Sequence, residues 1–128
     1  MIAELQDVLR TPYLLGGRQV GIGLDCLGVV AEVARRRGIP PPDGWPSIRS
    51  AWEQGQVDTS TGFPAGWCRM PPGTTAVDGD VLLLWTGMHP WCAIVHEGLV
   101  VSAHPDSGPY AMPLWRWRQP VSELWRFR

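Results

Sequence analysis

Glycine and proline limit what this chain can fold into more than any other feature of its sequence. There are 15 glycines and 13 prolines among the 128 residues, and both residue types interrupt helices and the interiors of strands. We therefore expect short elements joined by ordered loops, without long helices. A chain of this length can bury its own core, since domains most often run to roughly 100–150 residues. We expect residues 1–128 to form a single domain.

The charge pattern argues against two classes of partner. All 11 basic residues are arginines and the net charge is −1, so no excess positive field exists to hold a nucleic acid backbone. No apolar run approaches the ~18 residues of a transmembrane helix. Residues 1–9 carry Glu4 and Asp7 where a signal peptide would carry positive charge. We expect no nucleic acid partner, no membrane partner, no signal peptide and synthesis in the cytoplasm.

The cysteines favour free thiols. Cys26, Cys68 and Cys92 are an odd number at wide spacing, which fits neither a disulfide framework nor a paired zinc-ligand motif. We therefore expect reduced cysteines, no metal site and no cofactor.

The N-terminal part predicts two helices with a glycine-rich loop between them. Apolar residues recur at helical spacing from Ile2 to Leu9, and the pattern stops at Thr11-Pro12. Residues 12–23 are rich in glycine and predict a shaped loop. Asp25 then stands as an N-cap before an apolar stretch from Cys26 to Arg37, which ends with arginines, a glycine and a proline. This pattern places Cys26 in the first turn of the second helix.

The C-terminal half predicts a sheet. After a connection over residues 40–77, with one short helix near Ser47–Gln54, the apolar period changes to that of strands. The Glu97-Gly98 pair predicts a tight hairpin turn. Helices followed by a mostly antiparallel sheet define the α+β class. The predicted strands are Val81–Trp85, Trp91–His96, Leu99–His104, Tyr110–Leu114 and Ser122–Phe127.

Cys26 is a candidate nucleophile, because a thiol reacts as the thiolate and a helix N-terminus favours that form. The alternative is a packing role, since free cysteines are among the most buried residues. Cys92 lies inside a predicted strand, and we expect it to belong to the core.

The three histidines all fall in or beside the predicted hairpin. His89 lies at the mouth of a strand, from which its ring can reach a helix terminus, and His96 beside the turn is expected to be solvated. A two-residue turn pairs Trp91 with His104 and Ala93 with Ser102, so His104 and Ser102 share a face near the His89 end. Either is a candidate to orient His89, and for each histidine an ordinary structural role is the alternative.

Two segments resemble the signature of the NlpC-type cell-wall cysteine peptidases. Residues 11–17 (TPYLLGG) followed by 21–30 (GIGLDCLGVV) are similar to the family's "G-x-P-Y-x-x-G-G" and "D-C-S-G-L-V" motifs. Residues 78–84 (DGDVLLL) look like the family's "G-D-L-V-F-F" strand, which precedes its catalytic histidine. Leu27 in place of the commoner serine and the short chain are most similar to the branch encoded by tailed bacteriophages.

This resemblance implies a papain-like fold and hydrolysis of a bacterial wall stem peptide, typically between D-γ-glutamate and a diamino acid. Cys26 would attack, His89 would act as base and then acid, and His104 or Ser102 would orient His89, with His104 preferred. Asp25 takes the place of the aspartate that helps to hold the substrate's amino group, and Tyr13 that of the motif tyrosine that lines the cleft. For Asp25 an N-cap role and for Tyr13 a buried structural role are the alternatives.

The implied function is a peptidoglycan-cleaving cysteine peptidase made in the bacterial cytoplasm and carried in a phage tail, where it opens the wall locally. Its partners would be the stem peptide and other phage tail proteins. The competing hypothesis is a non-catalytic wall-binding or structural tail module of the same fold.

Overall fold

A computed structural model describes residues 2–42, 44, 59–86 and 89–128, with the backbone alone described for residues 2, 85, 86, 89 and 90. The helix predicted near Ser47–Gln54 lies outside the described residues. No helix in the described ranges is long and apolar enough to cross a membrane.

The helical part comprises a short N-terminal helix and one longer helix. The first is a 3-10 turn, η1 (Ile2–Leu5), that continues as a single α-helical turn, α1 (Gln6–Leu9). The second, α2 (Cys26–Arg36), begins after the N-cap Asp25, as predicted. It ends where Gly38 takes a φ of 75° and the Ile39 N–H donates to Ala34 O at 2.9 Å, a glycine-terminated helix end.

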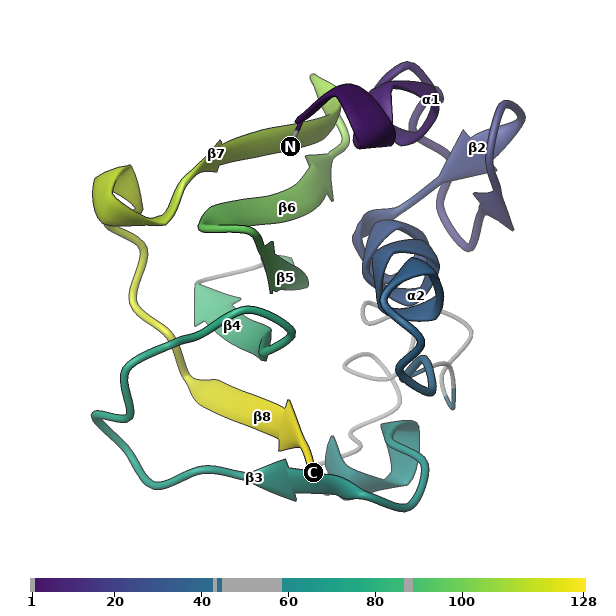
Figure 1. The fold of residues 1–128 in the computed structure, drawn as a ribbon. Coiled ribbons are helices and arrows are strands. Elements are labelled where there is room, and N and C mark those ends of the chain that lie inside the picture. Colours follow the sequence, from purple (N-terminus) through teal and green to yellow (C-terminus); the bar gives the residue numbers. More distant parts are fainter. Residues whose placement is uncertain (1, 43, 45–58, 87–88) are drawn as a thin grey trace.

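Among the described residues, six strands form one antiparallel sheet, which confirms the α+β class. The strands are β3 (Trp67–Arg69), β4 (Val81–Thr86), β5 (His89–His96), β6 (Leu99–His104), β7 (Gly108–Pro113) and β8 (Glu123–Phe127). Their order across the sheet is β3-β8-β4-β5-β6-β7, which Figure 1 shows running from β3 at the bottom to β7 at the top, with α2 to one side. In the β5–β6 hairpin Ile94 pairs with Val101 and His96 with Leu99, which is the predicted register. The two pairs named in the prediction, Trp91 with His104 and Ala93 with Ser102, lie outside these paired positions. Glu97 and Gly98 both have positive φ, 49° and 76°, as a two-residue hairpin turn requires.

Both faces of the central strands are buried. Cys92 and Ile94 of β5 belong to a core shared with α2, and the alternate residues Ala93 and Val95 belong to a second core on the other face. Leu114 and Trp117 help to cover that second core. Burial on two faces explains why these strands are continuous apolar runs in the sequence and do not alternate with polar residues.

Strand β3 and some small elements were not foreseen, whereas β7 was predicted as the strand Tyr110–Leu114. The three-residue strand β3 forms one edge and β7 forms the other, where it is contacted by α1. The small strands β1 (Arg18–Gln19) and β2 (Gly23–Leu24) and the 3-10 turns η2 (Thr59–Gly62) and η3 (Leu114–Arg116) were expected as loops or as strand ends. Short elements of two to four residues carry too little periodicity to be read from sequence.

Candidate functional site

The glycine-rich loop before α2 is held in one shape by its own backbone. Its strands β1 and β2 pair as a small antiparallel hairpin. The Leu24 N–H donates to Pro12 O at 3.0 Å, and the Leu14 N–H donates to Leu24 O at 3.2 Å. The Gly21 N–H at the hairpin tip donates to Thr11 Oγ1 at 2.8 Å. Hydrogen bonds therefore fix the loop at both ends, and the loop leads directly into the start of α2.

Asp25 ties this loop to the helix. Its Oδ1 accepts hydrogen bonds from the Gly28 N–H and from Arg18 Nη1, and its Oδ2 accepts one from the Gly16 N–H, each at 2.8 Å. The carboxylate is 2% exposed. The N-cap role is confirmed. The role in holding a substrate amine stays a prediction, and three donors of the protein itself already occupy the carboxylate.

Two glycines allow the loop to lie directly on the helix. A Cβ atom at Gly28 would overlap the carbonyl oxygen of Gly17, and one at Gly17 would overlap the carbonyl oxygen of Gly23. The first turn of α2 is thus in backbone contact with the loop, which a larger residue at either position would prevent.

The Cys26 thiol lies at the N-terminus of α2, against the sheet. The residue is 6% exposed, and it belongs to the same buried core as Cys92 of β5. Cys92 is fully buried, as predicted. Burial raises the pKa of the Cys92 thiol well above its usual value, and the neighbouring Cys26 adds to the shift. The two cysteines, 66 residues apart in the sequence, therefore lie in one buried core between α2 and the sheet.

Two residues with hydroxyl groups lie on β6 and β7, the strands that follow β5 in the sheet. The buried Ser102 of β6 donates its hydroxyl to Cys92 O at 2.6 Å. Tyr110 of β7 pairs with Ser102 across the sheet, and burial raises its pKa from 10.0 to about 12. The Ser102 hydroxyl thus links β6 to the backbone of Cys92.

The structure does not bring the two candidate histidines, His89 and His104, into contact with Cys26 among the described side chains. The backbone of His89 opens β5, paired with Thr86, and its side chain lies outside what the structure describes. His104 ends β6, where its Nδ1 accepts from the Asp106 N–H at 3.1 Å and its ring meets the Trp91 ring edge-on at 6.2 Å. Within the described ranges no hydrogen bond joins His104 to Cys26. The roles of both histidines as base and orienting residue stay predictions.

Tyr13 lies on the loop that leads to Cys26. Its backbone forms an isolated bridge with Leu24, and its half-buried ring packs against the core that contains Cys26. This position is compatible with both predicted roles, a wall of the site and a structural tyrosine.

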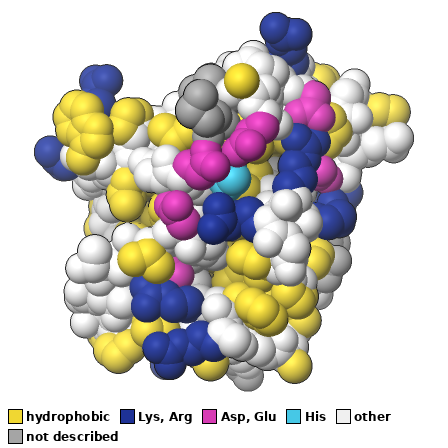
Figure 2. All heavy atoms as spheres, viewed as in Figure 1, with side chains coloured by type: hydrophobic (Ala, Val, Ile, Leu, Met, Phe, Trp, Pro, Cys, Tyr) yellow, Lys and Arg dark blue, Asp and Glu magenta, His cyan; other side chains and the backbone are white. Residues whose placement is uncertain are grey.

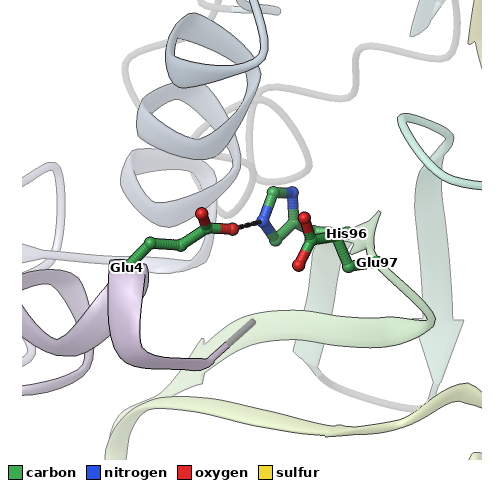
Figure 3. Close-up of side chains that lie close together, drawn as sticks. All are labelled: Glu4, His96 and Glu97. Carbon is green, nitrogen blue, oxygen red and sulfur yellow. Dashed lines mark hydrogen bonds and ion pairs between the residues drawn. The ribbon is translucent and has the colours of Figure 1, made fainter.

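His96 is buried, so the prediction that it is solvated was wrong. Its side chain is 9% exposed. Nε2 lies 2.6 Å from Glu4 Oε1, and Nδ1 lies 3.0 Å from Arg37 Nη1. Figure 3 shows Glu4 of η1 reaching across to this ring. The hydrogen bond to His96 lowers the pKa of Glu4. Neither partner is near His96 in the sequence, so a residue beside a turn is covered by the N-terminus and by the end of α2.

Glu4, His96 and Glu97 lie close enough for one atom of each to approach a common ion, since their ligand atoms lie within 4.8 Å of one another. Arg37 argues against that use. A guanidinium only donates, so Nδ1 of His96 accepts, the hydrogen sits on Nε2, and no lone pair there faces the carboxylates. Figure 2 shows acidic and basic side chains mixed around a histidine on this face. The cluster therefore has a structural role: its polar contacts connect η1, the end of α2 and the β5–β6 turn.

Sequence reasoning did not identify Arg18, Tyr110 or Cys92 as neighbours of the candidate nucleophile. Arg18 stands in a loop without periodicity, and Tyr110 and Cys92 reach the site through strand order and the packing of α2 on β5. The sequence did point to Cys92, because it is a second cysteine in a strand predicted to lie near the helix. That pattern predicted that Cys92 is buried, but not which residues surround it.

No protein-family model matches this chain, and no curated protein matches its sequence.

Proposed function

We propose that this chain is an NlpC-type cysteine peptidase with a papain-like fold, which hydrolyses a peptide bond in bacterial peptidoglycan stem peptides. The observation that carries the proposal is the position of Cys26 as the first residue of α2, after an N-cap whose carboxylate is buried. A glycine loop, a capped helix with a cysteine in its first turn and an antiparallel sheet packed on that helix occur together and in this order.

The chemistry needs a sulfur nucleophile with negative charge stabilised beside it. Amide groups at a helix N-terminus favour an anion there, and the Cys26 sulfur occupies that position. The thiolate attacks the scissile carbonyl, the leaving amine takes a proton from His89, and water then releases the acyl group from Cys26. His89 lies three residues before Cys92 on β5, about 10 Å along the strand at the usual rise.

The proposed substrate is the bond between D-γ-glutamate and a diamino acid, and the proposed setting is a phage tail that opens the wall locally. The sequence motifs of residues 11–30 and 78–84 support both, through their resemblance to the phage-encoded branch of the family. Stem peptides and other tail proteins would then be the partners.

One observation favours a second candidate, a non-catalytic wall-binding or structural tail module. The Cys26 side chain is nearly buried and belongs to the hydrophobic core. A thiol that only packs would show the same burial.

Purified protein incubated with muropeptides of different stem chemistry, read by mass spectrometry, separates the two candidates. We expect the wild type to release one stem fragment and Cys26→Ser to lose hydrolysis by several orders of magnitude, because an alcohol is not appreciably deprotonated near neutral pH. Circular dichroism should show an unchanged fold, since the replacement is nearly isosteric.

Cys68→Ser is the matched control, because Cys68 is exposed and should keep full activity. Hydrolysis by Cys26→Ser at the wild-type rate would overturn the mechanism. Muropeptides that bind and are never cleaved by the wild type would support the non-catalytic module.

A further inference from the structure

The histidine at the end of β5 is buried between two charged side chains from other elements. Nε2 of His96 lies 2.6 Å from Glu4 Oε1 of η1, and Nδ1 lies 3.0 Å from Nη1 of Arg37, the C-cap residue of α2. Figure 3 shows Glu4 reaching the ring. Because a guanidinium only donates, Nδ1 accepts and the ring is neutral. One ring nitrogen therefore acts as a donor and the other as an acceptor.

The Arg37 guanidinium depends on that acceptor. In the described part of the chain, the contact with His96 Nδ1 is the one side-chain hydrogen bond of Arg37, and its buried Nε has no partner there. The group lies against the turn before β4, since a Cβ on Gly79 would be 3.6 Å from Arg37 Nε. A neutral imidazole thus holds a positively charged side chain against the sheet.

We propose that His96 is a pH-sensitive switch, which holds the Arg37 side chain when the imidazole is neutral and releases it when the imidazole is protonated. Acid would then disconnect the end of α2 from β5. Histidine is the side chain whose charge ordinarily changes between about pH 5 and pH 8. This inference goes beyond the proposed function and does not depend on it.

Protonation turns Nδ1 from an acceptor into a donor. A proton taken from water onto Nδ1 would face the Arg37 Nη1 donor across 3.0 Å, between two positive charges. Rotation of the ring does not restore the contact, because both nitrogens of an imidazolium donate. A buried guanidinium without an acceptor is costly, so the Arg37 side chain moves into water.

The contact with Glu4 responds in the opposite way. The Nε2–H of His96 already donates to Glu4 Oε1, and a charged ring makes this hydrogen bond stronger. The same hydrogen bond lowers the pKa of Glu4. Among the described residues, the charged groups that face His96 are Glu4 from η1, Arg37 from the end of α2 and Glu97 from the turn. Only the guanidinium contact is lost on protonation.

The expected change is local. The backbone N–H of Arg37 donates to Val33 O at 3.0 Å, and the Ile39 N–H donates to Ala34 O at 2.9 Å, so the end of α2 keeps its helical hydrogen bonds. η1 also stays attached, because Arg36 Nη1 donates to Glu4 O at 3.1 Å. Release of Arg37 therefore removes a side-chain connection and leaves the helix intact.

Nuclear magnetic resonance of the isotope-labelled full chain, titrated from about pH 8 to about pH 5, tests the switch. The ring-nitrogen shifts of His96 report its tautomer and charge, and the Arg37 Nε–H signal reports the surroundings of the guanidinium. At the alkaline end we expect the hydrogen of His96 on Nε2. On acidification Nδ1 should gain a proton, and the Arg37 Nε–H should exchange faster with water at the same midpoint. The Ile39 amide signal should stay unchanged.

His96→Gln is the matched control, because a glutamine amide can donate to Glu4 and accept from Arg37 and does not titrate. Its Arg37 signal should be constant over the same pH range, and tryptophan fluorescence checks its fold. An Arg37 signal that does not follow the His96 titration would overturn the proposal, and so would a His96 that stays neutral throughout. An equal response in folded His96→Gln would also overturn it. The wild-type titration decides alone if the variant does not fold, and no step uses a muropeptide.

Discussion

Replacing Asp25 by alanine tests whether the start of α2 depends on one buried carboxylate. The change removes the acceptor for the Gly28 N–H, the Gly16 N–H and Arg18 Nη1. Loss of an N-cap costs about 1 kcal/mol, and loss of one partner from a buried ion pair costs about 3–5 kcal/mol. These contributions overlap, and Arg18 is 30% exposed and regains water, so we expect a loss of about 3 kcal/mol in the free energy of unfolding.

Urea denaturation followed by tryptophan fluorescence measures this loss from the shift in midpoint at constant slope. Asp7→Ala is the matched control, because Asp7 also pairs with an arginine, Arg36, and is 55% exposed. Such exposed pairs contribute about 0–1 kcal/mol. Equal losses for Asp7→Ala and Asp25→Ala would refute the reasoning, because the burial of Asp25 would then carry no energetic weight.

Three further outcomes follow from other contacts. Gly28→Ala should lower the free energy of unfolding, measured by urea denaturation, by about 1–3 kcal/mol, because the new Cβ overlaps Gly17 O. An increase of about 1 kcal/mol, the usual effect of alanine's higher helix propensity, would show instead that the loop moves aside. Ultraviolet titration of phenolate should show a transition near pH 12 that Tyr110→Phe removes. Because the pKa of Tyr110 is higher in the folded protein than the 10.0 of the unfolded chain, protonated Tyr110 contributes to stability below pH 10, and this contribution is lost as the pH rises through about 12. His89→Ala should abolish hydrolysis of muropeptides while His104→Ala costs less, because a base transfers the proton and an orienting residue sets its angle; an active His89→Ala would place the base elsewhere.

Local signals predicted those parts of the fold that are built locally. The start of α2 was readable because Asp25, Cys26 and the terminal glycine lie within one short segment. The register of β5 and β6 was readable because a two-residue turn fixes which residues pair.

The parts that could not be predicted depend on contacts distant in sequence. His96 is paired with Glu4 across 92 residues and with Arg37 across 59, so its neighbours in the sequence gave the wrong environment. Cys92 was correctly predicted as buried, but its place in the same core as Cys26 arises from the packing of α2 on β5, which no local period encodes.

The two outer strands of the sheet determine how this protein avoids sticking to copies of itself. An open edge offers unpaired backbone groups to any other strand. Edge strand β7 contains Pro109 and Pro113, which lack an N–H to donate, and α1 packs beside it. Edge strand β3 has only three residues, ending at Arg69, and is followed by Pro71 and Pro72. The prolines, the short length of β3 and the cover by α1 therefore disfavour the addition of a strand from another copy at either edge.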